Sequence, residues 1–469
     1  MRKVRAYIWL GHFVICAYAG MSASLVAADT LEWALVQAYQ NNPSLNAQRA
    51  LLRATDENVP QALSGYRPKL SVTGQGGYNS VGETSLLVLP GSAPVATPFG
   101  QAFISNNVGA TGTYTLFNGF QTANRARQAE NQVEGARETL RVTEQQVLLD
   151  AATAYMNLLR DQAIVALDRT NVLVLTEQLR QTRDRYITGE VSSTDVAQAQ
   201  ARLAISRFSL LGAAANHVAS QANYRRVIGV DPGQLAPGRA VDRLSPANLA
   251  KAIEQGEAQN PSVLAATYGV DIAELAVKIS EGALYPNLTL TASVLQATNP
   301  GFEVLKETST SVIGQLTIPV YQGGAEYSAI RQSKETLGQQ RLTLDVNRDQ
   351  ARATVVQSWG QRDAAQSQIT AATSAVNAAE VALNGVREEA HVGQRATIDV
   401  LNAQQELVNA RLALITAQHD RVIASYALLA AVGGLSMQRL RLDVAIYDPM
   451  VHYQQVRDAW IGLRNPDGR

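Results

Sequence analysis

The stretch RYITGEVSSTDVAQAQARL, residues 185–203, has a relative further along the chain, EAHVGQRATIDVLNAQQEL, at residues 389–407. The two align without a gap at a separation of 204 positions, so that Gly189 corresponds to Gly393. In each copy a long polar and alanine-rich segment leads up to the glycine, and another follows the Asp-Val pair. This pattern predicts two helices joined by a tight turn, and the chain carries it twice.

Each turn has the residue types that a connection between two helices requires. The glycine suits the left-handed backbone position just past a helix end. The hydroxyl of Ser193, or of Thr397 in the second copy, suits the N-cap of the following helix. Asp195 or Asp399 then lies in the positively polarised first turn of that helix. We therefore predict two equivalent helix-turn-helix connections, each with an acid near the start of its second helix.

The repetition extends well beyond the turns. LEWALVQAYQNNPSL from Leu31 returns as LAKAIEQGEAQNPSV from Leu249, and Pro68 corresponds to Pro286, at a separation of 218 positions. The chain is therefore two copies of one unit, the second of which is 14 residues shorter before its long helical segment. The predicted organisation is a first repeat at 29–228, a linker at 229–245, a second repeat at 246–442 and a tail at 443–469.

Residues 1–28 have the pattern of a secretory signal peptide. Three basic residues precede an apolar run at 6–19, and Val-Ala-Ala at 26–28 offers a small-residue cleavage site. A retained membrane anchor is the alternative, but the apolar run is short for a span. The single cysteine, Cys16, lies within this segment and lacks the small residue that a lipoprotein cysteine needs before it. We expect a mature chain without lipid or disulfides that starts near Asp29.

The sequence offers no catalytic or cofactor-binding pattern. We find no glycine-rich phosphate loop and no nucleophile elbow. A zinc site needs three or four converging ligands, whereas the histidines after the predicted signal are scattered, at His217, His391, His419 and His452. The formal net charge of zero gives no electrostatic footprint for nucleic acid. We therefore expect no enzymatic activity, no cofactor, no metal and no nucleic-acid partner.

Alternating segments interrupt the helical pattern twice in each repeat. After Pro68 and Pro286, and again shortly before each long helical segment, apolar and polar residues alternate as they do in half-buried strands. We predict four strands of roughly ten residues or slightly more, each about long enough to cross a bilayer when tilted. The segments 81–100 and 297–307 between them are predicted to be exposed loops. The residues predicted to face lipid are Leu70, Val72, Leu288, Leu290, Leu316 and Ile318.

Four strands in one chain leave a physical problem, because an open sheet edge exposes backbone groups that hydrocarbon cannot satisfy. The sheet must therefore close with further copies of the chain. Membrane barrels start at about eight strands, so two copies would suffice and three would give about twelve. The helical segments 119–189 and 323–393 span 70 positions each, on the order of 100 Å as helix. The predicted fold class is mainly α with a small β part, a barrel continued by a helical cylinder.

The doubled NNPSL and QNPSV motifs, the proline-led strands after Pro68 and Pro286, and VGQRATIDVLNAQQEL at 392–407 resemble the TolC-like family of outer-membrane efflux and secretion channels. The likeness covers nearly the whole mature chain. It implies a homotrimer in the outer membrane of a Gram-negative bacterium, with a coiled-coil tunnel that extends into the periplasm. It also implies two partners, a periplasmic adaptor protein and an inner-membrane transporter that is either an ATP-driven exporter or a proton-driven pump.

The resemblance also implies a gate at the two turns. An arginine and an aspartate that tie neighbouring helix pairs together in the family map onto Arg395 and Asp195, while the family's partnering tyrosine corresponds to Ala390. An acid that forms a constricting ring maps onto Asp399, and a second ring position is Asn402. The alternative is that both acids mainly stabilise the first turns of their helices. The turn residues expected to receive the partner proteins are Gly189, Ser193, Gly393 and Thr397.

The tail IYDPMVHYQQVRDAWIG, from Ile446, resembles a C-terminal segment of the family branch that serves type I protein secretion. An amphipathic tail packed on the helices is the other interpretation. The predicted function is a passive channel-tunnel of a tripartite export system, which conducts drugs, other small molecules or secreted proteins. The alternative is a periplasmic or surface coiled-coil scaffold without a pore, in which four amphipathic strands have no evident use.

Overall fold

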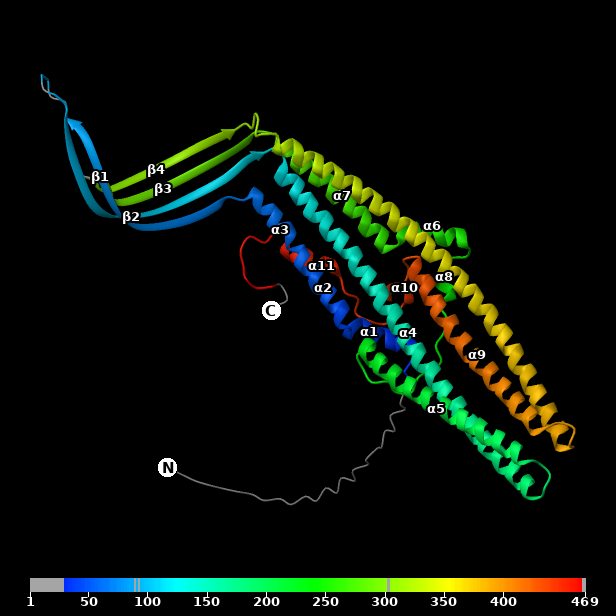
Figure 1. The fold of residues 1–469 in the computed structure, drawn as a ribbon. Coiled ribbons are helices and arrows are strands. Elements are labelled where there is room, and N and C mark those ends of the chain that lie inside the picture. Colours follow the sequence, from blue (N-terminus) through cyan, green and yellow to red (C-terminus); the bar gives the residue numbers. More distant parts are fainter. Residues whose placement is uncertain (1–28, 88–89, 92, 302–303, 466–469) are drawn as a thin grey trace, which may run out of the picture.

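The computed structural model describes residues 29–87, 90–91, 93–301 and 304–465. The predicted signal peptide and the last four residues of the predicted tail, 466–469, lie outside the described residues. The described chain combines long helices with one four-stranded antiparallel sheet, which projects from one end of the helices as a curved ribbon (Figure 1). None of the described helices is both long enough and apolar enough to cross a membrane.

The order of elements repeats along the chain. The first half contains α1 (Leu31–Asn41), α2 (Pro43–Asp56), α3 (Asn58–Leu63), the short 3-10 turn η1 (Ser64–Tyr66), β1 (Lys69–Leu87), β2 (Val95–Asn118), α4 (Gln121–Ile187) and α5 (Ser193–Ile228). The second half contains η2 (Asp242–Leu244), α6 (Leu249–Gln259), α7 (Pro261–Gly282), β3 (Asn287–Gly301), β4 (Val304–Thr317), α8 (Ala325–His391) and α9 (Thr397–Ala431). Two short helices follow, α10 (Met437–Leu440) and α11 (Pro449–Val456). The equivalent helices α4 and α8 both have 67 residues.

The long helices α4 and α8 set the length of the helical part. Each folds back at the end far from the sheet, α4 into α5 and α8 into α9, while α1, α2 and α7 pack along α4 nearer the sheet (Figure 1). Small side chains such as Ala151 and Ala152 are fully buried in α4. They let neighbouring helix axes approach closely, because the distance between packed helices depends on the side chains at the contact.

The largest hydrophobic core lies midway along the helices. It joins α1, the middle of α4 and the final turns of α5 and α9. The hydroxyl of the buried Tyr155 lies 2.7 Å from the carbonyl oxygen of Asp29 and 2.5 Å from that of Ala236. The N–H of Val241 donates to Ser425 Oγ of α9 at 3.1 Å. The start of the described chain and the segment between the two halves are therefore both bound to this core.

The asparagines of the doubled NNPSL and QNPSV motifs act alike in both halves. Asn42 Oδ1 accepts the N–H of Ser44 at the start of α2 (2.9 Å), and its Nδ2 donates to the carbonyl of Val227 near the end of α5 (3.1 Å). Asn260 repeats both bonds, at 2.9 Å to the N–H two residues on and 3.0 Å to the carbonyl of Ala431 at the end of α9. The proline that follows occupies a first helical position that needs no N–H donor.

The strands are longer than predicted. β1 to β4 contain 19, 24, 15 and 14 residues. The pairing of β1 with β2 continues without a shift as far as Leu87 and Val95. The prediction of exposed loops over 81–100 and 297–307 is therefore wrong for most of their length. Hairpin pairing joins main-chain groups, so it continues where the alternation of side chains has ended.

Candidate functional site

Both predicted turns lie at the end of the helices far from the sheet (Figure 1). Gly189 and Gly393 have φ angles of 81° and 80°, the left-handed conformation that their position predicts. Their N–H groups donate to the carbonyls of Tyr186 and Ala390 at 3.1 and 3.2 Å. A Cβ added at either glycine meets no atom within 4 Å. The left-handed backbone, rather than crowding, is therefore the reason for glycine at both turns.

The N-cap of α5 lies one residue before the predicted one. Ser192 rather than Ser193 is the cap: its Oγ accepts the N–H of Asp195 (3.3 Å), and Asp195 Oδ2 accepts the N–H of Ser192 (3.0 Å). The Ser192 hydroxyl also donates to the same carboxylate at 2.7 Å. The side-chain and backbone hydrogen bonds from Ser192 lower the pKa of Asp195. Asp195 is thus one half of a capping box.

The second turn has only half of this arrangement. Its cap position is Ala396 rather than the predicted Thr397, and an alanine side chain cannot accept a hydrogen bond. One bond remains, from the N–H of Ala396 to Asp399 Oδ2 at 3.3 Å. Thr397, like Ser193 in the first turn, is the first residue of its helix. The carboxylate of Asp399 is consequently held less firmly than that of Asp195.

Arg395 is paired within its own turn. Its Nε donates to Glu389 Oε2 at 2.8 Å. The hydrogen bond and the charge of Glu389, and next the charge of Asp399, raise the pKa of Arg395. Within the described part of a single chain Arg395 and Asp195 do not pair, because each has a local partner. Ala390, at the position of the family's tyrosine, is buried in the contact of α8 with α9.

Asn402 connects the two helical hairpins. Its Oδ1 accepts a hydrogen bond from Arg202 Nη2 at 2.8 Å, which joins α9 to α5. Both side chains belong to exposed contacts near the turns. The resemblance gave Asn402 a place in a ring, and within the chain it is a bridge between hairpins.

A buried hydrogen-bonded chain, which the sequence did not reveal, lies one turn deeper. Arg387 Nη2 donates to Gln404 Oε1 (3.0 Å), and Gln404 Nε2 donates to Asn171 Oδ1 (3.2 Å). Asn171 Nδ2 in turn donates to Ser206 Oγ (3.0 Å). Gln404, Asn171 and Ser206 are buried. The three bonds link α8 to α9, α9 to α4 and α4 to α5. Glutamine recurs at the equivalent position of the first repeat, but Gln200 is exposed, so the recurrence does not mark this chain of bonds.

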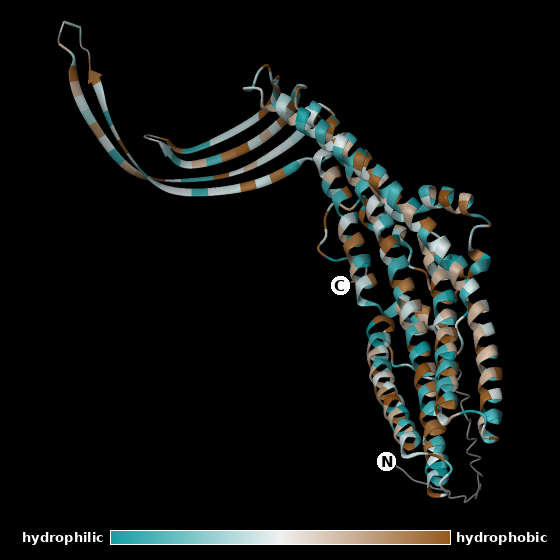
Figure 2. Cartoon of the chain, turned by 45° about the vertical axis from the view of Figure 1, so that its right-hand side comes forward, coloured by the Kyte–Doolittle hydropathy of each residue, from teal (hydrophilic) through white to brown (hydrophobic). Residues whose placement is uncertain are grey.

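One face of the sheet is apolar. Cross-strand pairing places Val72, Ala110 and Val294 beside one another, and residues two positions apart on a strand share a face. Apolar residues recur along the strands in Figure 2. Ile318 lies just beyond the end of β4. The other five residues predicted to face lipid do share this face: Leu70, Val72, Leu288, Leu290 and Leu316.

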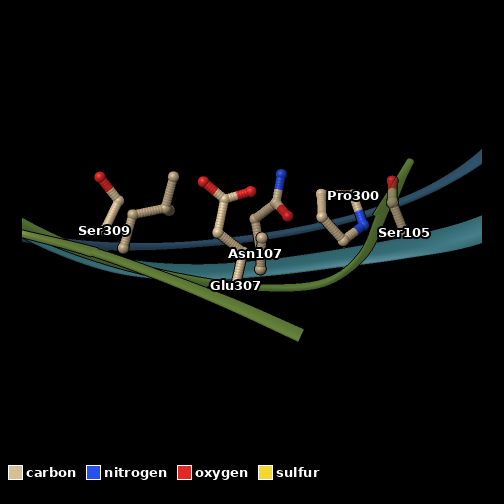
Figure 3. Close-up of a pocket in the computed structure, with 7 residues that line it drawn as sticks. Ser105, Asn107, Pro300, Glu307 and Ser309 are labelled. Atoms are coloured by element: carbon tan, nitrogen blue, oxygen red, sulfur yellow. The ribbon is translucent and has the colours of Figure 1, made fainter. Parts of the chain in front are cut away.

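The opposite face of the sheet is polar. Asn107 of β2 pairs with Ala297 of β3, which pairs with Glu307 of β4. A shallow pocket lies here, and the side chains of Ser105, Asn107, Glu307 and Ser309 project from the same side of the strands (Figure 3). The sheet therefore presents opposite chemistry on its two sides.

The described residues contain no cluster of three or more His, Cys, Asp or Glu side chains that could hold a metal ion. His217 and His452 each contact one side chain, and His419 contacts two, Asp420 and Asn157. His419 lies 2.8 Å from Asn157 Oδ1 inside the helical part, and His452 lies 2.8 Å from Asp56 Oδ2. Burial is the largest effect on the pKa of His419 and lowers it.

Comparison with known proteins gives concordant matches. The model of the family described as outer membrane efflux protein matches residues 34–230 and 252–434. The chain is 41% identical over 467 residues to outer membrane efflux protein BepC of Brucella suis biovar 1, and the match covers 99% of this chain and 97% of BepC. It is 26% identical over 450 residues to outer membrane protein TolC of Escherichia coli K12, covering 91% and 87%. The outer membrane channel CmeC of Campylobacter jejuni has a similar fold, with a TM-score of 0.75 at 15% identity, over 91% of this chain and 89% of that one.

Proposed function

Because the chain belongs to the outer membrane efflux protein family, it is an export channel subunit of the outer membrane that extends into the periplasm, and we propose that three copies close one barrel. The observation that supports this is the strand order β1-β2-β3-β4, which leaves β1 and β4 as edges within a chain. An open edge has no hydrogen-bonding partners in hydrocarbon. Pairing β4 of one copy with β1 of the next removes every edge.

The number of copies follows from the need for a lumen. Two copies give about eight strands, and barrels of about eight strands are just wide enough for side chains to fill. Three copies give about twelve strands and leave a passage. In this arrangement the apolar face of the sheet meets lipid, and the polar face with Asn107 and Glu307 lines the passage. A scaffold without a pore would have no use for a sheet with opposite chemistry on its two sides.

The helical turns are the proposed docking end. They lie at the opposite end of the chain from the sheet (Figure 1), so in the proposed channel they point toward the inner membrane. Turns around Gly189 and Gly393 would contact a periplasmic adaptor and an inner-membrane transporter, whose energy source drives export through a passive conduit. The family is one of channels rather than of enzymes. Specificity for cargo then resides in the transporter.

The gate is proposed to use Asp399. In a trimer three copies of this carboxylate surround the axis at the turns, and acidic rings in pores attract and hold cations. Asp399 accepts one hydrogen bond of 3.3 Å, so its carboxylate is freer to turn toward the axis than that of Asp195, which Ser192 holds with two hydrogen bonds. Arg395 would reach a neighbouring copy only by leaving Glu389.

Electrophoresis and planar-bilayer recording test the channel and its gate. The purified protein is expected to migrate as a trimer in mild detergent, to collapse on boiling, and to conduct ions in a bilayer. Asp399→Asn is expected to weaken block by divalent cations and lower the preference for cations, while Asp195→Asn serves as the control that removes a capping acid. A soluble monomer without conductance would refute the channel, and equal behaviour of both variants would refute the ring.

A further inference from the structure

An exposed aromatic residue lies at each of the four junctions between helix and strand. Tyr66 precedes β1, Phe120 follows β2, Tyr285 precedes β3 and Tyr321 follows β4. Aromatic side chains form girdles where membrane barrels meet water, and tyrosine and tryptophan suit this position because their apolar rings carry a polar group. In the proposed channel these four residues mark the height of the periplasmic membrane surface.

The C-terminal segment is held along the helices and directed toward this height. α11 packs on α2, with Val456 buried and His452 Nδ1 2.8 Å from Asp56 Oδ2. Just beyond α11, Arg457 lies 3.7 Å from Glu130 of α4. The tail leaves this contact beside α3, next to the start of the sheet (Figure 1).

Arg67 joins the tail to the beginning of β1. Its Nη1 donates to the carbonyl oxygen of Ala459 at 2.7 Å, and its guanidinium lies 4.6 Å from the centre of the Trp460 ring. β1 begins at Lys69, two residues after this arginine. A charge-assisted hydrogen bond and a cation-π contact from one side chain therefore hold Trp460 against Arg67, the residue that follows Tyr66 of the aromatic belt.

The end of the tail exposes three large apolar side chains. Trp460 is 68% exposed and Ile461 95%, and Leu463 is fully exposed. Arg464 comes next and adds a positive charge. Trp with aliphatic residues and a basic neighbour is the composition of segments that lie in the interface of a membrane, where the apolar side chains enter the acyl region and the cation meets phosphate.

We propose that residues 460–463 insert into the periplasmic leaflet of the outer membrane, as an anchor outside the barrel that binds phospholipid. This rests on the proposed function, because it requires the sheet to cross that membrane. The anchor would fix the height and tilt of the helical cylinder relative to the membrane at a point contributed by each chain. It gives the tail a role that packing of α11 on α2 alone does not.

Quenching by brominated phosphatidylcholine tests the insertion. The mature chain has three tryptophans, Trp33, Trp359 and Trp460, so Trp33→Phe with Trp359→Phe leaves Trp460 as the single reporter. The trimer in brominated vesicles is expected to lose half or more of its Trp460 fluorescence relative to unbrominated vesicles. A chain in which Trp33 is the single reporter is the matched control, with a loss below a tenth, since Trp33 lies in α1 away from the sheet.

A reporter within the barrel separates this inference from the proposed function. Val72→Trp in a chain without other tryptophans places the indole on the apolar face of β1, where brominated lipid should quench it. Quenching at position 72 but not at 460 overturns the anchor and leaves the channel intact, as expected if the segment instead covers a neighbouring copy. Quenching at neither position overturns both. If the double Phe variant does not assemble, the loss of quenching from the unmodified trimer to Trp460→Phe measures the same contact.

Discussion

An arginine scan across adjacent residues of β3 tests which face of the sheet meets lipid. Thr291 and Ala292 are neighbours on the strand and point to opposite faces, Thr291 between Thr113 and Ile313, Ala292 between Gly112 and Val312. Replacing either by arginine adds the same charge at nearly the same depth. Only the face differs, so the pair isolates the effect of lipid from that of the substitution itself.

The expected cost follows from depth. Ala292 is five residues into β3 from Asn287, about 17 Å along the strand at ~3.4 Å per residue and about 12 Å along the membrane normal at ~45° tilt. That is close to the middle of an apolar band about 25 Å tall, where an arginine costs roughly 2–4 kcal/mol. The same arithmetic places Leu290 about 7 Å from Asn287 along the membrane normal, nearer the membrane surface, so Leu290→Arg should cost less than Ala292→Arg. A factor of ten per ~1.4 kcal/mol converts the full cost into a roughly 30- to 1000-fold loss in the folding equilibrium of each chain.

The assay is the yield of heat-modifiable trimer in outer membranes, followed by urea titration of protein refolded into vesicles. Ala292→Arg should lower both the yield and the unfolding midpoint, with Leu290→Arg intermediate. Thr291→Arg and Thr289→Arg, on the polar face, should stay close to the unmodified chain. Equal losses from Thr291→Arg and Ala292→Arg, or a harmless Ala292→Arg, would refute the assignment of faces.

Three further predictions concern the turns. Gly393→Val should cost ~1–3 kcal/mol of backbone strain and reduce export while trimers persist; Gly385→Val, at an open position within α8, is the control in the same export assay. The pKa of Asp195 is lower in the folded chain than in the unfolded chain, so its contribution to helix stability, ~0.3–1 kcal/mol, is present above about pH 4 and is lost as the pH falls through the pKa of the folded state. Amide exchange at the start of α5 should show this loss in the unmodified chain and not in Asp195→Asn. Gln404→Leu leaves the buried Asn171 Oδ1 without this donor, which should cost about 1–3 kcal/mol of stability and raise single-channel conductance by loosening the hairpins; Gln405→Leu, at the half-exposed neighbour whose side chain bonds Asn409 of its own helix, should leave conductance unchanged.

The sequence predicted the turns because their requirement is local. A left-handed residue after a long helix favours glycine whatever surrounds it, and Gly189 and Gly393 have that conformation. The N-caps were each misplaced by one residue for an equally local reason. Ser192 and Ser193 are adjacent hydroxyls of equal capping ability, and only the backbone angles at Ser192 decide between them. Thr397 aligns with Ser193, so it too is one residue past the cap position, which is Ala396.

The length of the strands and the buried hydrogen-bonded chain were not predictable in this way. Hairpin pairing between Leu87 and Val95 depends on main-chain groups, which the side-chain pattern does not report. Asn171 and Gln404 are 233 positions apart, and each looks like an ordinary polar helix residue until the two hairpins meet. Interactions across that separation are set by packing rather than by local propensity.

The paired asparagines have a consequence for the order in which the chain folds. Asn42 bonds a carbonyl 185 positions away and Asn260 one 171 positions away, so each half can fasten its first helix only after its last helix has formed. Contacts of such separation slow folding, because the intervening chain must first be ordered. Both bonds, however, stay inside their own half. A chain that emerges through a membrane from its N-terminus can therefore form the Asn42 bond while the second half is still unfolded, whereas the core shared with α9 and the pairing of β2 with β3 form only when the second half arrives.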